Sequence, residues 1–157
     1  MKKNLLIIGL LIAGFISFSF VQEEDTVPEV EYKVITSIES IVSNGLGRSR
    51  LISSNIDRNY EDFTSGQTEE DNSRNKSKRG DIRVKDFEET KLLNFYNIGG
   101  IRFQNIVAND AVVSSKLTSM AKEGWELMFI NSAVESDSGK GDGQGIFVTR
   151  YTFKRVK

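Results

Sequence analysis

A glycine-rich segment near the C-terminus, Glu135 to Gly145, has the residue types and spacing of a ligand-binding loop. Its alternating glycines expose backbone groups, and Asp137 and Asp142 supply carboxylate oxygens, which are the ligands that calcium takes in proteins. The segment departs from the helix-loop-helix calcium pattern, because Gly139 and Gly141 stand where oxygen-bearing side chains would follow Asp137. A plain connector is the alternative, although hairpin connections usually need only about two to five residues.

A second glycine-rich segment, Asn44 to Arg50, could provide the opposite chemistry. Arg48 and Arg50, together with Lys140 of the first segment, are donors that would hold an anion. Turn formation alone also explains this segment, since Asn-Gly supplies the positive backbone angles of a tight turn. A dinucleotide-binding fingerprint is not matched, because Arg50 stands three residues after Gly47, where a glycine is required. The residue types therefore indicate no cofactor. Calcium bound by Asp137 and Asp142 is the alternative.

The chain has no histidine and no cysteine. Serine–histidine and cysteine–histidine nucleophile systems need these residues, and zinc sites mostly use them as ligands, so all three are excluded together with disulfides. Ser119 and Lys122 match a serine acylase pattern, but the helix predicted below places both on its solvated face. The sequence identifies no catalytic residue. It favours a non-enzymatic binding or interaction module, with a small carboxylate-dependent hydrolase as the alternative.

The charge balance narrows the choice of partner. The chain carries 21 basic and 22 acidic side chains, for a formal net charge of −1. Nucleic-acid binding is normally driven by clustered basic charge and counterion release, so DNA and RNA are not expected partners. A protein, a glycan or a small ligand is expected instead.

The N-terminus predicts export. Basic residues 2–3, the uncharged run 5–21 and the acidic stretch 23–25 follow one another in the order of a secretory signal. Ser17 and Ser19 are the small residues that would precede cleavage. The apolar run also comes close to the roughly 17 residues that span a bilayer, so an uncleaved anchor is the alternative. Residues 1–22 thus predict a periplasmic or extracellular protein, with membrane contact through residues 5–21 if the segment is retained.

The mature part, residues 23–157, is long enough for a single domain. Glu31 to Ile38 alternates as a half-buried strand, with Tyr32 and Val34 in the more apolar set. After the turn at Asn44, residues 48–53 are expected to return as its hairpin partner.

A polar insertion at about 57–81 follows, and from Thr64 to Gly80 it contains no apolar residue. Such a segment cannot bury anything, so it is expected to be disordered and flexible. Beyond it, 81–87 alternates as a strand, and 92–98 with 101–107 flank two glycines as a hairpin.

A helix is predicted next, capped by Asn109 or Asp110. Gly124 stands where a left-handed residue ends a helix, and that geometry would return Trp125 against Met120. These three residues are therefore expected to serve the structure, with ligand stacking as the alternative role of the tryptophan. The apolar stripe of the helix is expected to consist of Val113, Leu117, Met120 and Ala121.

Two strands complete the pattern. Residues 125–130 are apolar on both faces and predict a central or covered strand, and 146–156 predict the last strand. The expected fold is α+β, an antiparallel sheet of four to six strands with one long helix packed on one face.

Four pieces of the sequence form a recognisable pattern: Tyr32-Lys33-Val34-Ile35, then Leu117, then Lys122-Glu123-Gly124-Trp125-Glu126-Leu127, and the closing Phe153-Lys154-Arg155. Together they resemble the domain-of-unknown-function 4177 family. The resemblance covers about a third of the mature chain and departs from the family by the long stretch 43–108 between first strand and helix. The resemblance implies the same fold and no particular activity.

Overall fold

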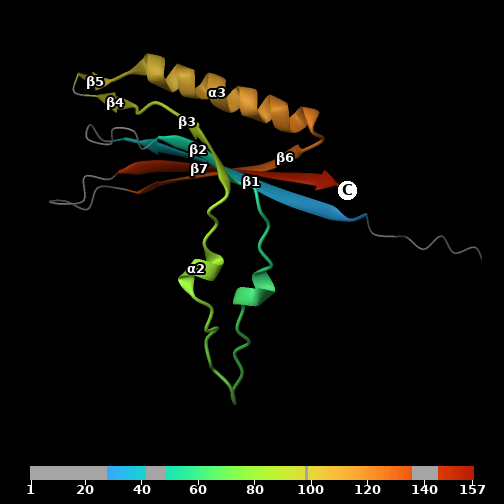
Figure 1. Cartoon of the computed structure of the whole chain (residues 1–157). Coiled ribbons are helices and arrows are strands. Elements are labelled where there is room, and N and C mark those ends of the chain that lie inside the picture. Colours follow the sequence, from blue (N-terminus) through green and yellow to red (C-terminus); the bar gives the residue numbers. More distant parts are fainter. Residues whose placement is uncertain (1–27, 42–48, 98, 136–144) are drawn as a thin grey trace, which may run out of the picture.

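The computed structural model describes residues 28–41, 49–97, 99–135 and 145–157, which form a sheet, a long helix and a projecting arm (Figure 1). The strands of the sheet are antiparallel and lie in the order β3-β2-β1-β7-β6. This 5-stranded sheet, crossed on one face by the helix, confirms the predicted α+β class. The bounds are β1 Val30–Ser40, β2 Arg50–Ser54, β3 Phe87–Lys91, β6 Glu126–Glu135, β7 Ile146–Val156 and the helix α3 Phe103–Lys122.

The first and last strands form the centre of the sheet. β1 and β7 pair over their full length, from Val30 opposite Val156 to Ser40 opposite Ile146. β2 lies on the other side of β1, antiparallel to it, as the hairpin pattern predicts. The two central strands of the sheet therefore come from the two ends of the described chain.

The face of β1 that lies against the core is the opposite of the predicted one. Tyr32 and Val34 were expected to face the core, but they are 64% and 45% exposed, whereas Ile35 is 2% exposed. Alternation identifies two faces and does not say which one is covered. The neighbouring strands decide this, because β2 and β7 bring Leu51 and Phe153 to the same side as Ile35, where all three join the core.

The long helix begins earlier than predicted. The expected cap, Asn109 or Asp110, lies well inside α3, which begins at Phe103 with Arg102 in the cap position. Most of the stretch 101–107, expected to be a strand, is therefore helix. The cap prediction was wrong because the side chain of Asn109 is buried and makes hydrogen bonds to chain outside the helix.

The end of α3 has the geometry that the sequence predicts. Gly124 has a φ of 84°, and its N–H donates to the Ala121 carbonyl at 3.1 Å. The Trp125 N–H donates to the Met120 carbonyl at 3.0 Å, which completes a Schellman motif. Trp125 and Met120 both belong to the buried core. Ala121 was expected in the apolar stripe but is exposed, and Val112 packs against the core instead.

β6 lies at an edge of the sheet, which corrects the prediction of a central or covered strand. In the described part of the chain it pairs with β7 alone. Every residue from Glu126 to Glu135 is exposed, including Phe129 at 61%, Ile130 at 54% and Val134 at 56%. The strands that contribute to the core cluster are β1, β2 and β7, so the side chains of β6 remain uncovered.

The middle region is less regular than predicted. Residues 81–87 do not form a strand, because Arg79–Ile82 is a short helix, α2, and pairing with β2 begins only at Phe87. The predicted hairpin about two glycines is present in a reduced form, as Tyr96–Asn97 (β4) paired with Gly100–Ile101 (β5). Each of these two strands is two residues long because α3 begins immediately afterwards.

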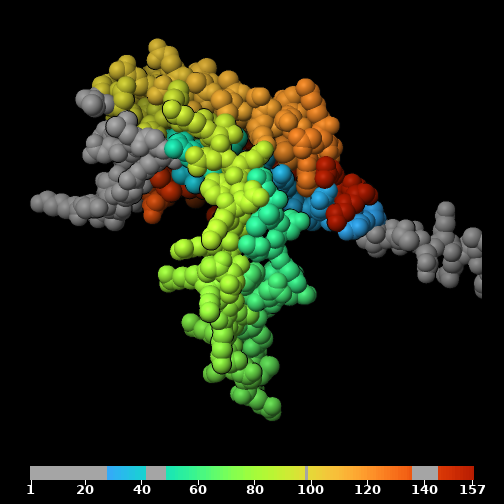
Figure 2. Space-filling model, in the orientation of Figure 1, coloured from blue at the N-terminus to red at the C-terminus, as the bar shows by residue number. Residues whose placement is uncertain are grey.

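Residues 55–86 leave the sheet as an arm on the side away from α3, and Figure 2 shows it standing clear of the rest of the molecule. At its base the Asn55 N–H donates to the Asp86 carbonyl at 3.2 Å. Further out, Asn75 Nδ2 donates to the carbonyls of Asp62 and Thr64 at 3.0 and 3.2 Å. No residue of the arm is buried. Hydrogen bonds thus join the two limbs of the insertion that was expected to be disordered, while its mobility in solution stays a prediction.

We expect trypsin to cut the folded protein first in the arm, at Arg74, Lys76, Lys78 or Arg79. No apolar side chain between Thr64 and Gly80 is available to offset the entropy lost on ordering. Limited proteolysis with mass spectrometry would locate the cuts, and the nicked protein should keep its melting temperature. Resistance of all four sites in the folded protein would contradict this prediction.

The predicted signal or anchor, residues 1–22, lies outside the described residues. Among the helices that the structure describes, none has the length and apolar character needed to cross a membrane.

Candidate binding face

The sheet has one face that none of the described helices covers, and we call it the open face (Figure 1). Pairing register places Val34 of β1 opposite Thr152 of β7, and Phe129 of β6 opposite the same threonine, so these side chains share one side. Several exposed apolar side chains on one face are typical of an interaction site. Its apolar side chains include Tyr32, Val34, Ile52, Phe87, Phe129 and Val156.

An apolar hollow of about 380 Å³ lies on the open face where the arm returns to the sheet. Val34 and Ile52 line it from the sheet, and Val84 and Phe87 line it from the end of the arm and the start of β3. The remaining lining residues are Thr36, Ser53 and Ser54. Its volume falls in the range of about 300 to 1,000 Å³ that is typical of ligand sites. The hollow can therefore hold an apolar group that enters from the open face.

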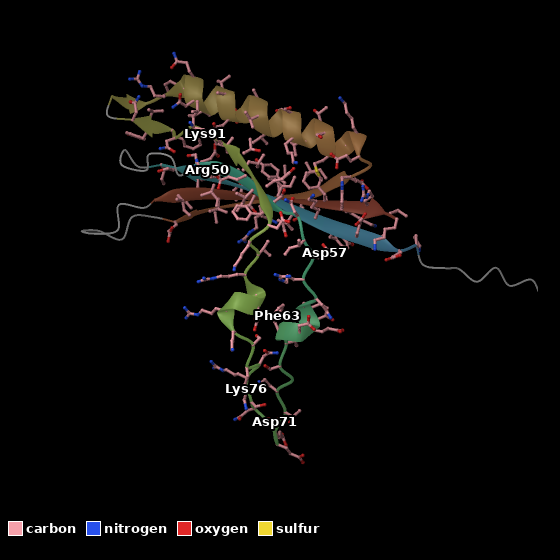
Figure 3. The ribbon with its side chains drawn as sticks, viewed as in Figure 1. Arg50, Asp57, Phe63, Asp71, Lys76 and Lys91 are labelled. Carbon is pink, nitrogen blue, oxygen red and sulfur yellow. The ribbon has the colours of Figure 1, made fainter. Side chains whose placement is uncertain are left out.

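The arm gives the hollow charged surroundings. Its returning limb, residues 72–86, leads directly into the hollow and carries the basic residues Arg74, Lys76, Lys78, Arg79, Arg83 and Lys85. None of them forms an ion pair with another described residue. The charged residues of the outgoing limb, 55–71, are mostly acidic. In Figure 3 several nitrogen-tipped side chains of the returning limb project away from the outgoing limb. The returning limb is therefore an accessible basic surface next to an apolar hollow.

A second hollow, of about 400 Å³, lies between β1 and the start of the arm. Its lining includes Trp125 and two carboxylates, Glu31 and Asp57. A pair of carboxylates is what the alternative function, a carboxylate-dependent hydrolase, requires. Glu31 is held by Arg155 at 2.6 Å, and the same guanidinium lies over the Trp125 ring at 4.3 Å from its centroid. Glu31 thus takes part in the packing at the end of α3.

Most residues of the predicted ligand site lie outside the described part of the chain. These are Arg48, Asp137, Lys140 and Asp142. Arg50 is described, and it pairs with Glu89 at 2.8 Å on the open face. The described flanks of the two glycine-rich segments meet, because the Ile41 N–H donates to the Gly145 carbonyl at 3.1 Å. No cluster of acidic side chains suited to a metal occurs among the described residues, and calcium at the two aspartates stays a prediction.

A buried polar brace beneath α3 was missed by the sequence analysis. Asn109, 2% exposed, accepts from the Leu93 N–H at 2.8 Å and donates to the Leu93 carbonyl at 2.7 Å. Its Nδ2 also donates to Glu39 Oε1 at 2.7 Å. Burial raises the pKa of Glu39, the hydrogen bond from Asn109 opposes this rise, and the charge of Asp110 adds to it. Nothing in the sequence near Asn109 indicates these contacts, because all of them join distant segments.

Comparisons of the chain with protein families, with characterised proteins and with solved structures find no match. The resemblance to the domain-of-unknown-function 4177 family accordingly stays a prediction.

Proposed function

We propose that this protein is an exported binding module that holds an extended segment of a partner protein on its open face. An apolar side chain of the partner enters the hollow at Val34 and Phe87, and carboxylates that follow it in the partner lie along the returning limb of the arm. The observation that carries the proposal is an apolar hollow placed directly beside a basic limb whose charges have no ion pairs among the described residues.

The two parts of this surface would contribute in different ways. Burial of an apolar side chain stabilises a complex by roughly 1.5 to 3 kcal/mol. Basic side chains on an exposed arm attract an acidic segment over a longer range, which raises the association rate and selects the sign of the partner's charge. As part of the same proposal, residues 1–22 direct the module to the periplasm or the extracellular space, or hold it at a membrane if they are retained.

The binding proposal can be tested with two labelled peptides that share the apolar triplet Phe-Ile-Phe, one followed by five glutamates and one by five lysines. The acidic peptide should bind at least tenfold more tightly, and its affinity should fall as salt is raised, because exposed charges are screened. Phe87→Ser should weaken its binding about tenfold or more, since roughly 1.4 kcal/mol corresponds to a factor of ten.

Phe103→Ser is the matched control, because Phe103 is an aromatic residue with 73% exposure on α3, away from the open face. This variant should bind like the wild type. Equal affinity for the two peptides, or equal loss in both variants, would contradict the proposed site.

A further inference from the structure

The two edges of the sheet are built differently. β3 is five residues long and charged: its Glu88 pairs with Lys116 at 2.7 Å and its Glu89 pairs with Arg50 at 2.8 Å. β6 is ten residues long and has no charged residue between Glu126 and Glu135. Proteins usually protect an edge strand from pairing with other chains by short length, charges or proline. β3 has two of these protections, and the interior of β6 has none of them.

β6 also exposes large aliphatic side chains, which are usually covered when a strand has neighbours on both sides. Ile130 lies opposite Tyr151, and Val134 lies opposite Phe147, on the same side of the sheet as α3. They are 54% and 56% exposed although they adjoin the covered face. The pairing of β6 with β7 has an irregularity between Leu127 and Phe129 and is regular from there to its end. The strand thus offers a regular, uncharged outer edge.

We propose that β6 pairs with β6 of a second copy of this chain, antiparallel and about a two-fold axis at Ser132. In this register Ile130 of each copy lies opposite Val134 of the other, which gives two identical aliphatic pairs on the helix side. Asn131 then lies opposite Ala133, and Glu135 lies opposite Phe129. The two sheets become one continuous sheet, and both strands lose their free edge from Phe129 to Glu135.

Self-complementarity is the reason to choose a second copy over an unrelated peptide. Ile130 and Val134 are placed symmetrically about Ser132, so the strand matches itself when it is reversed. An axis between Ile130 and Asn131 would instead place Glu126 opposite Glu135, and like charges directly opposite each other are destabilising. This inference goes beyond the proposed function and does not depend on it, because the hollow is lined by residues of β1, β2, the arm and β3, and none of β6.

Disulfide trapping tests the register directly, because the full chain has no cysteine of its own. Directly opposite residues in an antiparallel pair have Cα atoms about 4.5 to 5.5 Å apart, within the range that a disulfide bridges. Ser132→Cys should therefore form a covalent dimer under mild oxidation. A mixture of Ile130→Cys and Val134→Cys should form the mixed dimer. Thr90→Cys, on the edge strand β3, is the control and should remain monomeric on a non-reducing gel.

The wild-type chain should sediment as a dimer at micromolar concentration. Ile130→Lys should shift it to a monomer with an unchanged circular dichroism spectrum, because it introduces the charge that protects β3, whereas Thr90→Lys should leave the dimer intact. A monomeric wild type, a dimer that survives Ile130→Lys, or equal cross-linking at positions 90 and 132 would overturn the proposal. Loss of peptide binding at the open face would leave these results unchanged, so the two proposals fail separately.

Discussion

Trp125→Ala should lower the free energy of unfolding by about 3 to 5 kcal/mol, the range found when large aromatic side chains are removed from a core. Trp125 is 9% exposed and packs with Met120 and Phe153 in the core cluster. The guanidinium of Arg155 lies over the Trp125 ring, and the same guanidinium donates to the Glu123 carbonyl at 3.0 Å. These contacts join the end of α3 to β7. Denaturant unfolding followed by circular dichroism would measure the loss.

Gly124→Ala provides the internal comparison for this effect. A Cβ at this position meets only Arg155 Cδ, at an ordinary 3.6 Å, so the cost comes from the positive φ alone and should be about 1 to 2 kcal/mol. The tryptophan variant should therefore be clearly the less stable of the two. A Trp125 variant with wild-type stability and impaired ligand binding would instead assign this residue to ligand stacking.

Asn109→Ala should also be destabilising, by about 2 kcal/mol or more, because it removes a buried side chain that pairs the N–H and the carbonyl of Leu93, and each group left unpaired costs roughly 1 to 3 kcal/mol. The pH dependence should change as well. A carboxyl whose pKa is raised on folding binds protons more tightly in the native state, so the contribution of Glu39 to the stability of the wild type falls as pH rises above about 4.5. Loss of the Asn109 hydrogen bond removes the interaction that lowers the pKa of Glu39, so this fall should extend to higher pH.

Glu39→Gln separates the two parts of this result. The amide keeps an oxygen that can accept from Asn109 Nδ2 but does not titrate, so the decline in stability above pH 4.5 should become smaller. The unfolding free energies of the three proteins at pH 4.5 and pH 7 would measure this. The prediction fails if Asn109→Ala unfolds at the wild-type denaturant concentration, or if Glu39→Gln leaves the pH profile unchanged.

Features that depend only on neighbouring residues could be predicted from the sequence. The left-handed Gly124 and the return of Trp125 toward Met120 follow from contacts within one turn of the chain. The last strand, Ile146–Val156, has the predicted bounds because its alternation is uninterrupted. The number of strands in the sheet was also within the predicted range.

Features that depend on strand order could not be predicted. The sequence of β6 is apolar enough for a central strand, and it is an edge because β7 is its one partner among the described strands. Asn109 has the side chain of a helix cap, and its buried role depends on where Leu93 runs. The hollow needs Val34, Ile52 and Phe87 from three different strands, so no local motif marks it.

The central position of β1 and β7 has a consequence for the order in which the molecule can form. The two strands pair along their whole length although one begins the described fold and the other ends it. In a nascent chain, the side of β1 that pairs with β7 has no partner until Ile146–Val156 has been synthesised. Contacts between distant parts of a chain form slowly, because a long loop must close before they contribute stability. The central strand pair therefore forms late, after every other element of the described fold has been synthesised.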